Sequence, residues 1–237
     1  MNNPERQYSE SYFYDEGLRK HMISTYSLVA KGLIATALSA GIVGATDLMK
    51  LFVNPEDGFT GLGLAVSLAP LALLLLFMFN FVGKSLVSIK VAFWSLVILL
   101  GPSIAITAWS YTGASVTNAA LAAIATFLGA SLYGYTTQRN LANIGSFLIM
   151  GLIGLIAASI INIFTASSAM DFALSVIAVI IFTGLTAWET QGMKVEYSQA
   201  RLADTDLERI KYLFAINLYL NIINLFRAIL NLTGDRS

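Results

Sequence analysis

The chain has 237 residues, of which 57% are hydrophobic and only 12% are charged, and its formal net charge is zero. A soluble domain of this length does not need so much apolar surface, so the composition indicates an integral membrane protein. The neutral balance provides no basic surface, and we expect no nucleic-acid partner. The absence of cysteine and the single histidine, His21, exclude disulfides, thiolate metal sites and multi-histidine metal sites.

Seven stretches are apolar over about the 20 residues that a helix needs to cross a bilayer. No apolar core with a cleavage site precedes the first stretch, so we expect the first helix to remain in the membrane. The sequence therefore predicts an all-α bundle of seven membrane helices, over residues 24–46, 60–80, 87–109, 115–135, 143–165, 171–191 and 211–232.

Basic residues in the connecting segments predict the orientation of this bundle. Most of them fall on one side, and the acidic stretch Asn54–Asp57 falls on the other. Since cytoplasmic loops are enriched in lysine and arginine, the N-terminus is predicted to be cytoplasmic and the C-terminus external. The expected parts are a cytoplasmic tail, a transmembrane domain containing one long cytoplasmic loop, and an external tail, at residues 1–23, 24–232 (loop 192–210) and 233–237.

Small residues four positions apart recur in three of the predicted helices. This spacing lets the backbones of neighbouring helices approach closely, so we interpret it as helix packing and not as ligand contact. The residues concerned are Ala37, Gly41 and Ala45, then Ala125 and Gly129, and then Gly154 and Ala158.

The last predicted helix carries a row of polar side chains within an otherwise apolar segment. At about 100° per residue, Asn217, Asn221 and Asn224 share one face, and Arg227 flanks it. Lipid offers these side chains no partners, so this face must contact protein or water. Two interpretations are open, namely hydrogen bonds that hold helices together and the lining of an ion pathway.

Four stretches of the sequence occur in an order that is typical of a known family. The chain reads DEGLRKHMISTYSLVAKGL at Asp15–Leu33, SLYGYTTQRNL at Ser131–Leu141, FTGLTAWETQ at Phe182–Gln191 and LYLNIINLF at Leu218–Phe226. These stretches resemble the Bax inhibitor-1 family, also called the transmembrane Bax-inhibitor-motif family, and the resemblance covers nearly the whole chain. It implies a seven-helix membrane fold with the last helix central.

Members of that family are described as pH-sensitive calcium leaks, as suppressors of cell death or, in bacteria, as modulators of a membrane protease. The short connections and compact N-terminus of this chain look more like a bacterial member. The resemblance therefore implies an integral protein of the bacterial cytoplasmic (inner) membrane.

The chain departs from the family at two positions of the implied leak mechanism. The family has two aspartates, within patterns like YDTQ and LYLDFINLF, where this chain has Glu189 and Asn221. Two neighbouring carboxylates share a proton that latches the helices, and this coupling is lost when only one carboxylate remains. The amide of Asn221 can still donate and accept hydrogen bonds, so we expect it to lie within hydrogen-bonding or single-water distance of Glu189.

Two functions of different classes remain open at this stage. In the first, the protein is a cation leak for calcium, with Glu189 as gate and metal ligand and with Asn217, Asn221, Asn224 and Arg227 along the pathway. In the second, it conducts nothing and regulates a membrane protease or another membrane complex through its N-terminal tail and the loop at 192–210. No phosphate-binding loop, metal-ligand cluster or nucleophile elbow is present, so we expect no enzymatic activity and no cofactor. The expected partners are the lipid bilayer and, depending on the function, calcium ions or a membrane protein.

Overall fold

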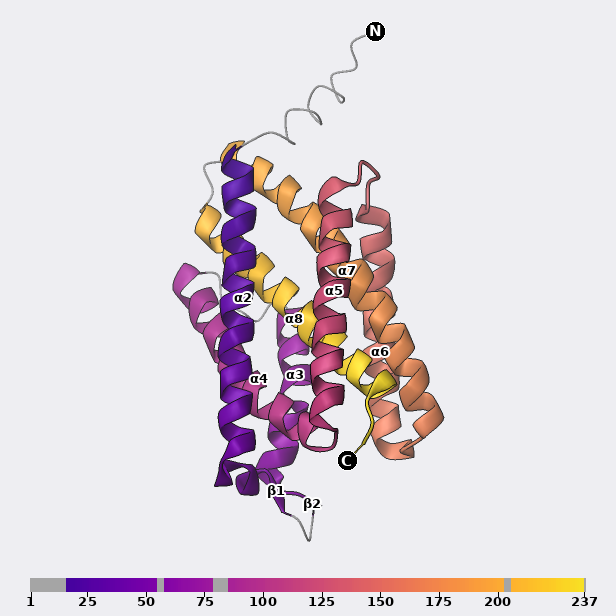
Figure 1. The fold of residues 1–237 in the computed structure, drawn as a ribbon. Helices are drawn as coiled ribbons and strands as arrows, with labels where there is room; N and C mark the ends of the chain where they lie inside the picture. The colour runs from indigo at the N-terminus through magenta and orange to yellow at the C-terminus, as the bar shows by residue number, and fades with distance from the viewer. Residues whose placement is uncertain (1–15, 55–57, 79–84, 203–205, 237) are drawn as a thin grey trace.

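The computed structural model describes residues 16–54, 58–78, 85–202 and 206–236 of the chain (Figure 1). These residues form seven α-helices, which confirms the predicted all-α fold. Six of the helices, α2 and α4 to α8, are long and apolar enough to cross a membrane. The helices are α2 (Glu16–Ala45), α3 (Gly61–Met78), α4 (Leu86–Trp109), α5 (Gly113–Thr136), α6 (Ala142–Thr165), α7 (Ser168–Leu202) and α8 (Leu207–Thr233).

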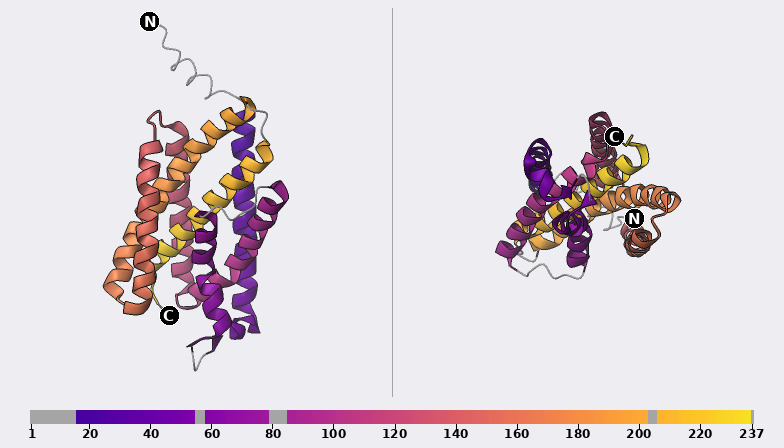
Figure 2. Two further views of the ribbon diagram at one scale, coloured as in Figure 1. Left: turned by 180° about the vertical axis from the view of Figure 1, so that it is seen from behind. Right: turned by 90° about the horizontal axis from the view of Figure 1, so that it is seen from below.

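Helix α8 is the central helix of the bundle, as the family resemblance implies. It packs against α2, α4, α5 and α7, and Figures 1 and 2 show it crossing the bundle obliquely. Its side chains Leu218, Tyr219 and Leu225 are fully buried in the main hydrophobic core. The last helix is thus surrounded by protein along most of its length, and its polar groups must find partners inside the bundle.

A buried hydrogen-bonded chain fixes α8 to two neighbouring helices. The hydroxyls of Tyr219 and Thr36 are 2.6 Å apart, and Thr36 Oγ1 donates to the carbonyl oxygen of Val97 at 3.2 Å. Because the single hydroxyl proton of Thr36 is used in that second bond, Tyr219 is the donor in the first. The chain connects α8 through α2 to α4.

The ends of the helices extend beyond the predicted spans at the end of the bundle opposite the C-terminus. Helix α2 begins at Glu16, so residues 16–23 of the predicted tail are helical, and the rest of that tail lies outside the described residues. Most of the predicted loop at 192–210 is also helical, because α7 continues to Leu202 and α8 begins at Leu207.

Polar contacts explain why the charged segment after residue 191 remains helical. The ammonium group of Lys194 donates to the carbonyl oxygen of Tyr135 at 2.7 Å, and Tyr197 is buried in the core. Asp206 caps α8, since its carboxylate accepts the backbone N–H groups of Glu208 and Arg209. Charge therefore does not end α7, because the charged groups bind protein at the edge of the bundle.

The spacing of small residues does not mark the close helix contacts. A Cβ atom at Gly41, Gly129 or Gly154 would meet no atom of the described chain within 4 Å, so the packing prediction is wrong for these glycines. The close approaches occur at other glycines. A Cβ at Gly101 would lie 2.3 Å from Ser39 Oγ of α2, and one at Gly134 would lie 2.2 Å from the carbonyl oxygen of Ala187 in α7.

The C-terminal segment folds back onto the connection between α4 and α5. Asp235 accepts a hydrogen bond of 3.0 Å from the backbone N–H of Thr112, and Arg236 forms a backbone bridge with Tyr111. At the same end of the bundle, the 3₁₀ helix η1 (Asp47–Leu51) and the short antiparallel strands β1 (Val53–Asn54) and β2 (Gly58–Phe59) connect α2 to α3 (Figure 1).

Candidate functional site

The polar face of α8 meets an acidic side chain of α7. The amide nitrogen of Asn217 donates a hydrogen bond of 3.1 Å to Oε1 of Glu189, and both side chains are partly buried. The contact between α7 and α8 is the most extensive helix contact in the bundle. The structure therefore brings together two of the predicted site residues in a contact that bridges the two helices.

Of the two expected contacts between Glu189 and Asn221, a hydrogen bond or a single bridging water, the direct hydrogen bond is not formed. Asn221 is 6% exposed, and its amide nitrogen has no hydrogen-bond partner among the described residues. Asn217 lies four residues earlier on α8, one helical turn away, and occupies the position that the family resemblance assigns to residue 221. The offset between α7 and α8 along their lengths decides which asparagine of α8 meets Glu189.

The hydroxyl groups near Glu189 on α7 have other partners. Thr183 and Thr186 donate to carbonyl oxygens one turn earlier on α7, at 2.6 Å and 2.7 Å. The hydroxyl of Thr190 lies 2.9 Å from the hydroxyl of Tyr26 in α2. Of these four α7 side chains, Glu189 is the one that accepts a hydrogen bond from an asparagine of α8 within the described residues.

Further along α8, Asn224 and Arg227 do not bind a carboxylate. Asn224 donates to the carbonyl oxygen of Leu220 in its own helix at 2.9 Å. A guanidinium nitrogen of Arg227 donates to Ser103 Oγ at 2.6 Å and more weakly to Thr107 Oγ1 at 3.4 Å, both on α4. Nε of Arg227 is buried and has no hydrogen-bond partner among the described residues. The positive charge is therefore held inside the bundle by neutral groups.

Arg227 lines a polar cavity of about 680 Å³ at the C-terminal end of α8. The cavity also contains Asn224, Asn231 and Arg236, and its acidic residue is Asp171 of α7. Asp171 accepts a hydrogen bond of 2.8 Å from Asn162. The asparagine row thus leads from Glu189 toward a polar cavity that carries two arginines and one aspartate.

Sequence reasoning missed Asn231 as a member of the polar face. Its amide nitrogen donates to Ser175 Oγ at 2.7 Å, and its carbonyl oxygen accepts a bond of 3.0 Å from the hydroxyl of Tyr111. The signal was present, because positions 217, 224 and 231 are each seven residues apart and share one helical face.

The arrangement provides few ligands for a tightly bound metal ion. In the part of the chain that the structure describes, no three acidic or histidine side chains are grouped so that they could hold a metal ion. Calcium takes six to eight oxygen ligands and prefers several that are anionic. A cation beside Glu189 would have one carboxylate and the amide oxygens of neighbouring asparagines, a set suited to transient contact.

Comparison with known proteins identifies relatives of the whole chain. Residues 18–237 match the family model described as "Inhibitor of apoptosis-promoting Bax1". A protein of Rickettsia prowazekii is 36% identical over 229 residues, which cover 96% of this chain and 94% of the relative. A protein of Caulobacter vibrioides is 37% identical over 225 residues, covering 93% and 90% of the two chains. The inner membrane protein YbhL of Escherichia coli is 33% identical over 221 residues, covering 93% of each.

Proposed function

Because this chain belongs to the Bax inhibitor-1 family, a family of multi-pass membrane proteins, we propose that it is a slow cation leak of the bacterial inner membrane, with calcium as its ion. The observation that carries this proposal is the hydrogen bond between Glu189 of α7 and Asn217 of the central helix α8. Burying an acidic side chain inside a membrane bundle costs free energy, and such groups commonly mark ion pathways.

The proposed pathway follows the asparagine row of α8. A cation that reaches Glu189 displaces the amide of Asn217. The carboxylate oxygen that accepts the hydrogen bond from this amide is also the oxygen that would bind the ion. The next polar group along α8 is Asn221, and its carbonyl oxygen can serve a passing cation while its amide nitrogen has no partner in the described chain. Asn224 then leads to the polar cavity.

Two features of the proposed pathway weaken its binding of the ion and slow the passage of the ion. Glu189 is the single carboxylate of the proposed latch, so an ion is not held tightly. Arg227 lies at the polar cavity and repels cations that pass it. In the conformation described here, the Asn217 bond and the buried packing of α8 represent the closed state.

The buried positive charge of Arg227 also favours a second candidate function. A cation pathway is not helped by an arginine that neutral hydroxyls hold in place. In the alternative, the protein conducts nothing and regulates a membrane protease or another membrane complex through its N-terminal tail and the segment at 192–210. The polar row would then serve only to hold helices together.

Ion flux in liposomes separates the two functions. Purified protein is reconstituted into vesicles that contain a calcium-sensitive dye, and calcium entry is compared with entry into protein-free vesicles of the same lipid. The leak predicts faster calcium entry with protein present and no comparable entry of chloride. Vesicles as tight as the protein-free control, with helicity of the reconstituted protein intact, would favour the non-conducting regulator.

A further inference from the structure

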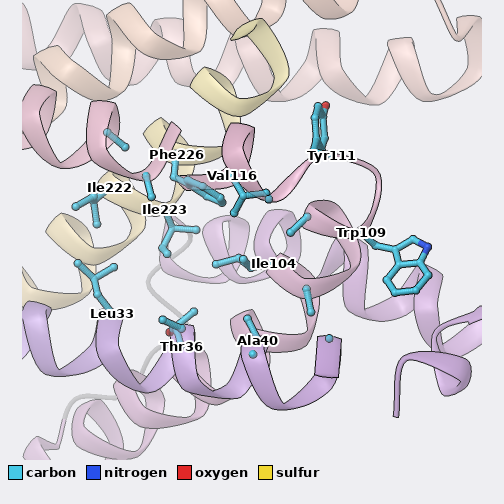
Figure 3. Close-up of a pocket in the computed structure, with 18 of the residues that line it drawn as sticks. Leu33, Thr36, Ala40, Ile104, Trp109, Tyr111, Val116, Ile222, Ile223 and Phe226 are labelled. Atoms are coloured by element: carbon cyan, nitrogen blue, oxygen red, sulfur yellow. The ribbon is translucent and has the colours of Figure 1, made fainter. Parts of the chain in front are cut away.

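An apolar cavity of about 570 Å³ lies beside α8, separate from the polar cavity that Arg227 lines. Its walls come from α2, α4, α5 and α8, and Figure 3 shows Ile104, Val116, Ile222, Ile223 and Phe226 around it. This volume is in the range of pockets that hold small organic ligands. Because the cavity lies between membrane helices, lipid is the class of molecule that we consider as its occupant.

Glycines of α2 leave this space empty. Gly41 and Gly44 both line the cavity, and a Cβ atom at either would meet no atom of the described chain within 4 Å. Helices α2 and α5 both contribute walls, and they contact each other away from the cavity, where the rings of Tyr26 and Phe127 lie 6.2 Å apart. Since protein interiors are normally close-packed, a space of this size between two membrane helices calls for an occupant from the bilayer.

The lining offers few hydrogen-bonding groups to a polar ligand. The polar side chains among the lining residues are Thr36, Tyr111 and Trp109, and the hydroxyls of Thr36 and Tyr111 are already engaged. Thr36 accepts from Tyr219 and donates to Val97, and Tyr111 donates to Asn231. Apolar cavities of this kind stay dry and bind apolar groups, so water and ions are poor occupants and a hydrocarbon chain is a good one.

The rim of the cavity carries groups that suit a lipid headgroup. Trp109 and Tyr111 line the apolar cavity and also line a neighbouring cavity that contains Arg236. The guanidinium of Arg236 lies 6.0 Å from the centre of the Tyr111 ring, and it forms no ion pair with a described residue. Aromatic side chains prefer the level of the headgroups, and arginine binds phosphate through charge-assisted hydrogen bonds.

We propose that the apolar cavity binds one acyl chain of an anionic phospholipid, whose phosphate lies against Arg236. The chain enters between α2 and α5 and packs on Ile222, Ile223 and Phe226 of the central helix. This lipid is an integral part of the folded bundle at the end where the C-terminal segment is fixed to Tyr111. The proposal does not depend on ion conduction.

Native mass spectrometry of the full-length protein tests this proposal. Delipidated protein in detergent is titrated with phosphatidylglycerol or with phosphatidylcholine that has the same acyl chains. The wild type should bind one phosphatidylglycerol, about tenfold more tightly than phosphatidylcholine. Arg236→Gln should remove this preference and leave the binding of phosphatidylcholine unchanged.

Filling the cavity supplies the second arm of the test. Gly41→Leu should weaken the binding of both lipids by about tenfold or more, because the new side chain occupies the space of the acyl chain. Gly129→Leu is the matched control, since that position is equally open but does not line the cavity. If Gly41→Leu does not fold, Gly44→Leu replaces it. Wild-type binding by the cavity-filled variant, or equal binding of the two lipids by the wild type, would overturn the proposal.

Discussion

The amide nitrogen of Asn217 lies 3.1 Å from Oε1 of Glu189, and this hydrogen bond joins α7 to the central helix α8 across 28 positions of sequence. In this contact a neutral amide is the partner of Glu189. A second carboxylate in its place would form such a bond only by sharing a proton with Glu189. An amide keeps its hydrogens at every physiological pH, so this contact is available whether or not a proton is supplied. The helices are thus joined by a contact whose donor does not titrate.

Loss of the Asn217 amide should open the bundle to cations. In Asn217→Leu, the Glu189 carboxylate has no amide donor, and a hydrogen bond to a charged group contributes about 1.5–3 kcal/mol. The open population, and with it calcium entry into liposomes, should rise by about tenfold. Thr117→Val is the control, because the Thr117 hydroxyl donates to the carbonyl oxygen of Gly113 in its own helix, α5, and is not part of the asparagine row. Equal entry rates for Asn217→Leu and wild type would argue against this contact as the gate.

A second carboxylate should restore dependence on pH. Asn221→Asp introduces an acidic group one turn from Asn217, the residue that binds Glu189, and we expect the two carboxylates to interact directly or through water. The shared proton closes the pair at low pH, whereas two ionised carboxylates repel each other at high pH and open it. Calcium entry should therefore rise more steeply between about pH 5 and 8 in this variant than in the wild type. The same pH profile for Asn221→Asp and the wild type would show that residues 189 and 221 do not interact.

Removal of the Tyr219 hydroxyl should weaken the bundle by a small, measurable amount. Tyr219→Phe loses the bond to Thr36, while Thr36 keeps its bond to Val97, so the expected loss is about 1 kcal/mol. The midpoint of thermal unfolding in detergent should fall by about 2–4 °C. Tyr212→Phe serves as the control, since the Tyr212 hydroxyl makes no hydrogen bond with a described residue. The same shift in both variants would contradict the assignment.

Two glycines of α5 should respond oppositely to the same substitution. Gly134→Ala places a Cβ 2.2 Å from the carbonyl oxygen of Ala187, so α5 and α7 must separate, at a cost of about 1–3 kcal/mol. Gly129→Ala meets no described atom within 4 Å and should stabilise the helix by about 0.5–1 kcal/mol. Thermal unfolding of the two variants checks the sign, and destabilisation by Gly129→Ala would reveal a contact at that position.

The helices themselves could be predicted from the sequence. A long apolar stretch in a bilayer must form its backbone hydrogen bonds internally, and a helix does so within a single segment. The predicted span at 143–165 differs from α6 by one residue. The partners of individual side chains were harder to predict. The sequence places Asn217 and Asn221 on one face of α8, but the offset between α7 and α8 that decides which of them meets Glu189 depends on packing along both helices.

The same reason explains the wrong interpretation of the small residues. A small-residue spacing describes one helix, whereas a close approach requires a partner at the matching height. Gly134 has such a partner in the backbone of Ala187, and Gly41 faces an open cavity instead. The contacts of Arg227 with Ser103 and Thr107 were also invisible in sequence, because they join positions more than a hundred residues apart.

The rate of calcium entry into liposomes that contain wild-type protein or Glu189→Gln tests the central claim most directly. The substitution keeps the size of the side chain and removes its charge, so a cation loses the one anionic group of the latch. We predict faster entry with wild type than with protein-free vesicles, and a rate close to the protein-free value with Glu189→Gln. Equal entry rates for wild type and Glu189→Gln would contradict a leak through Glu189.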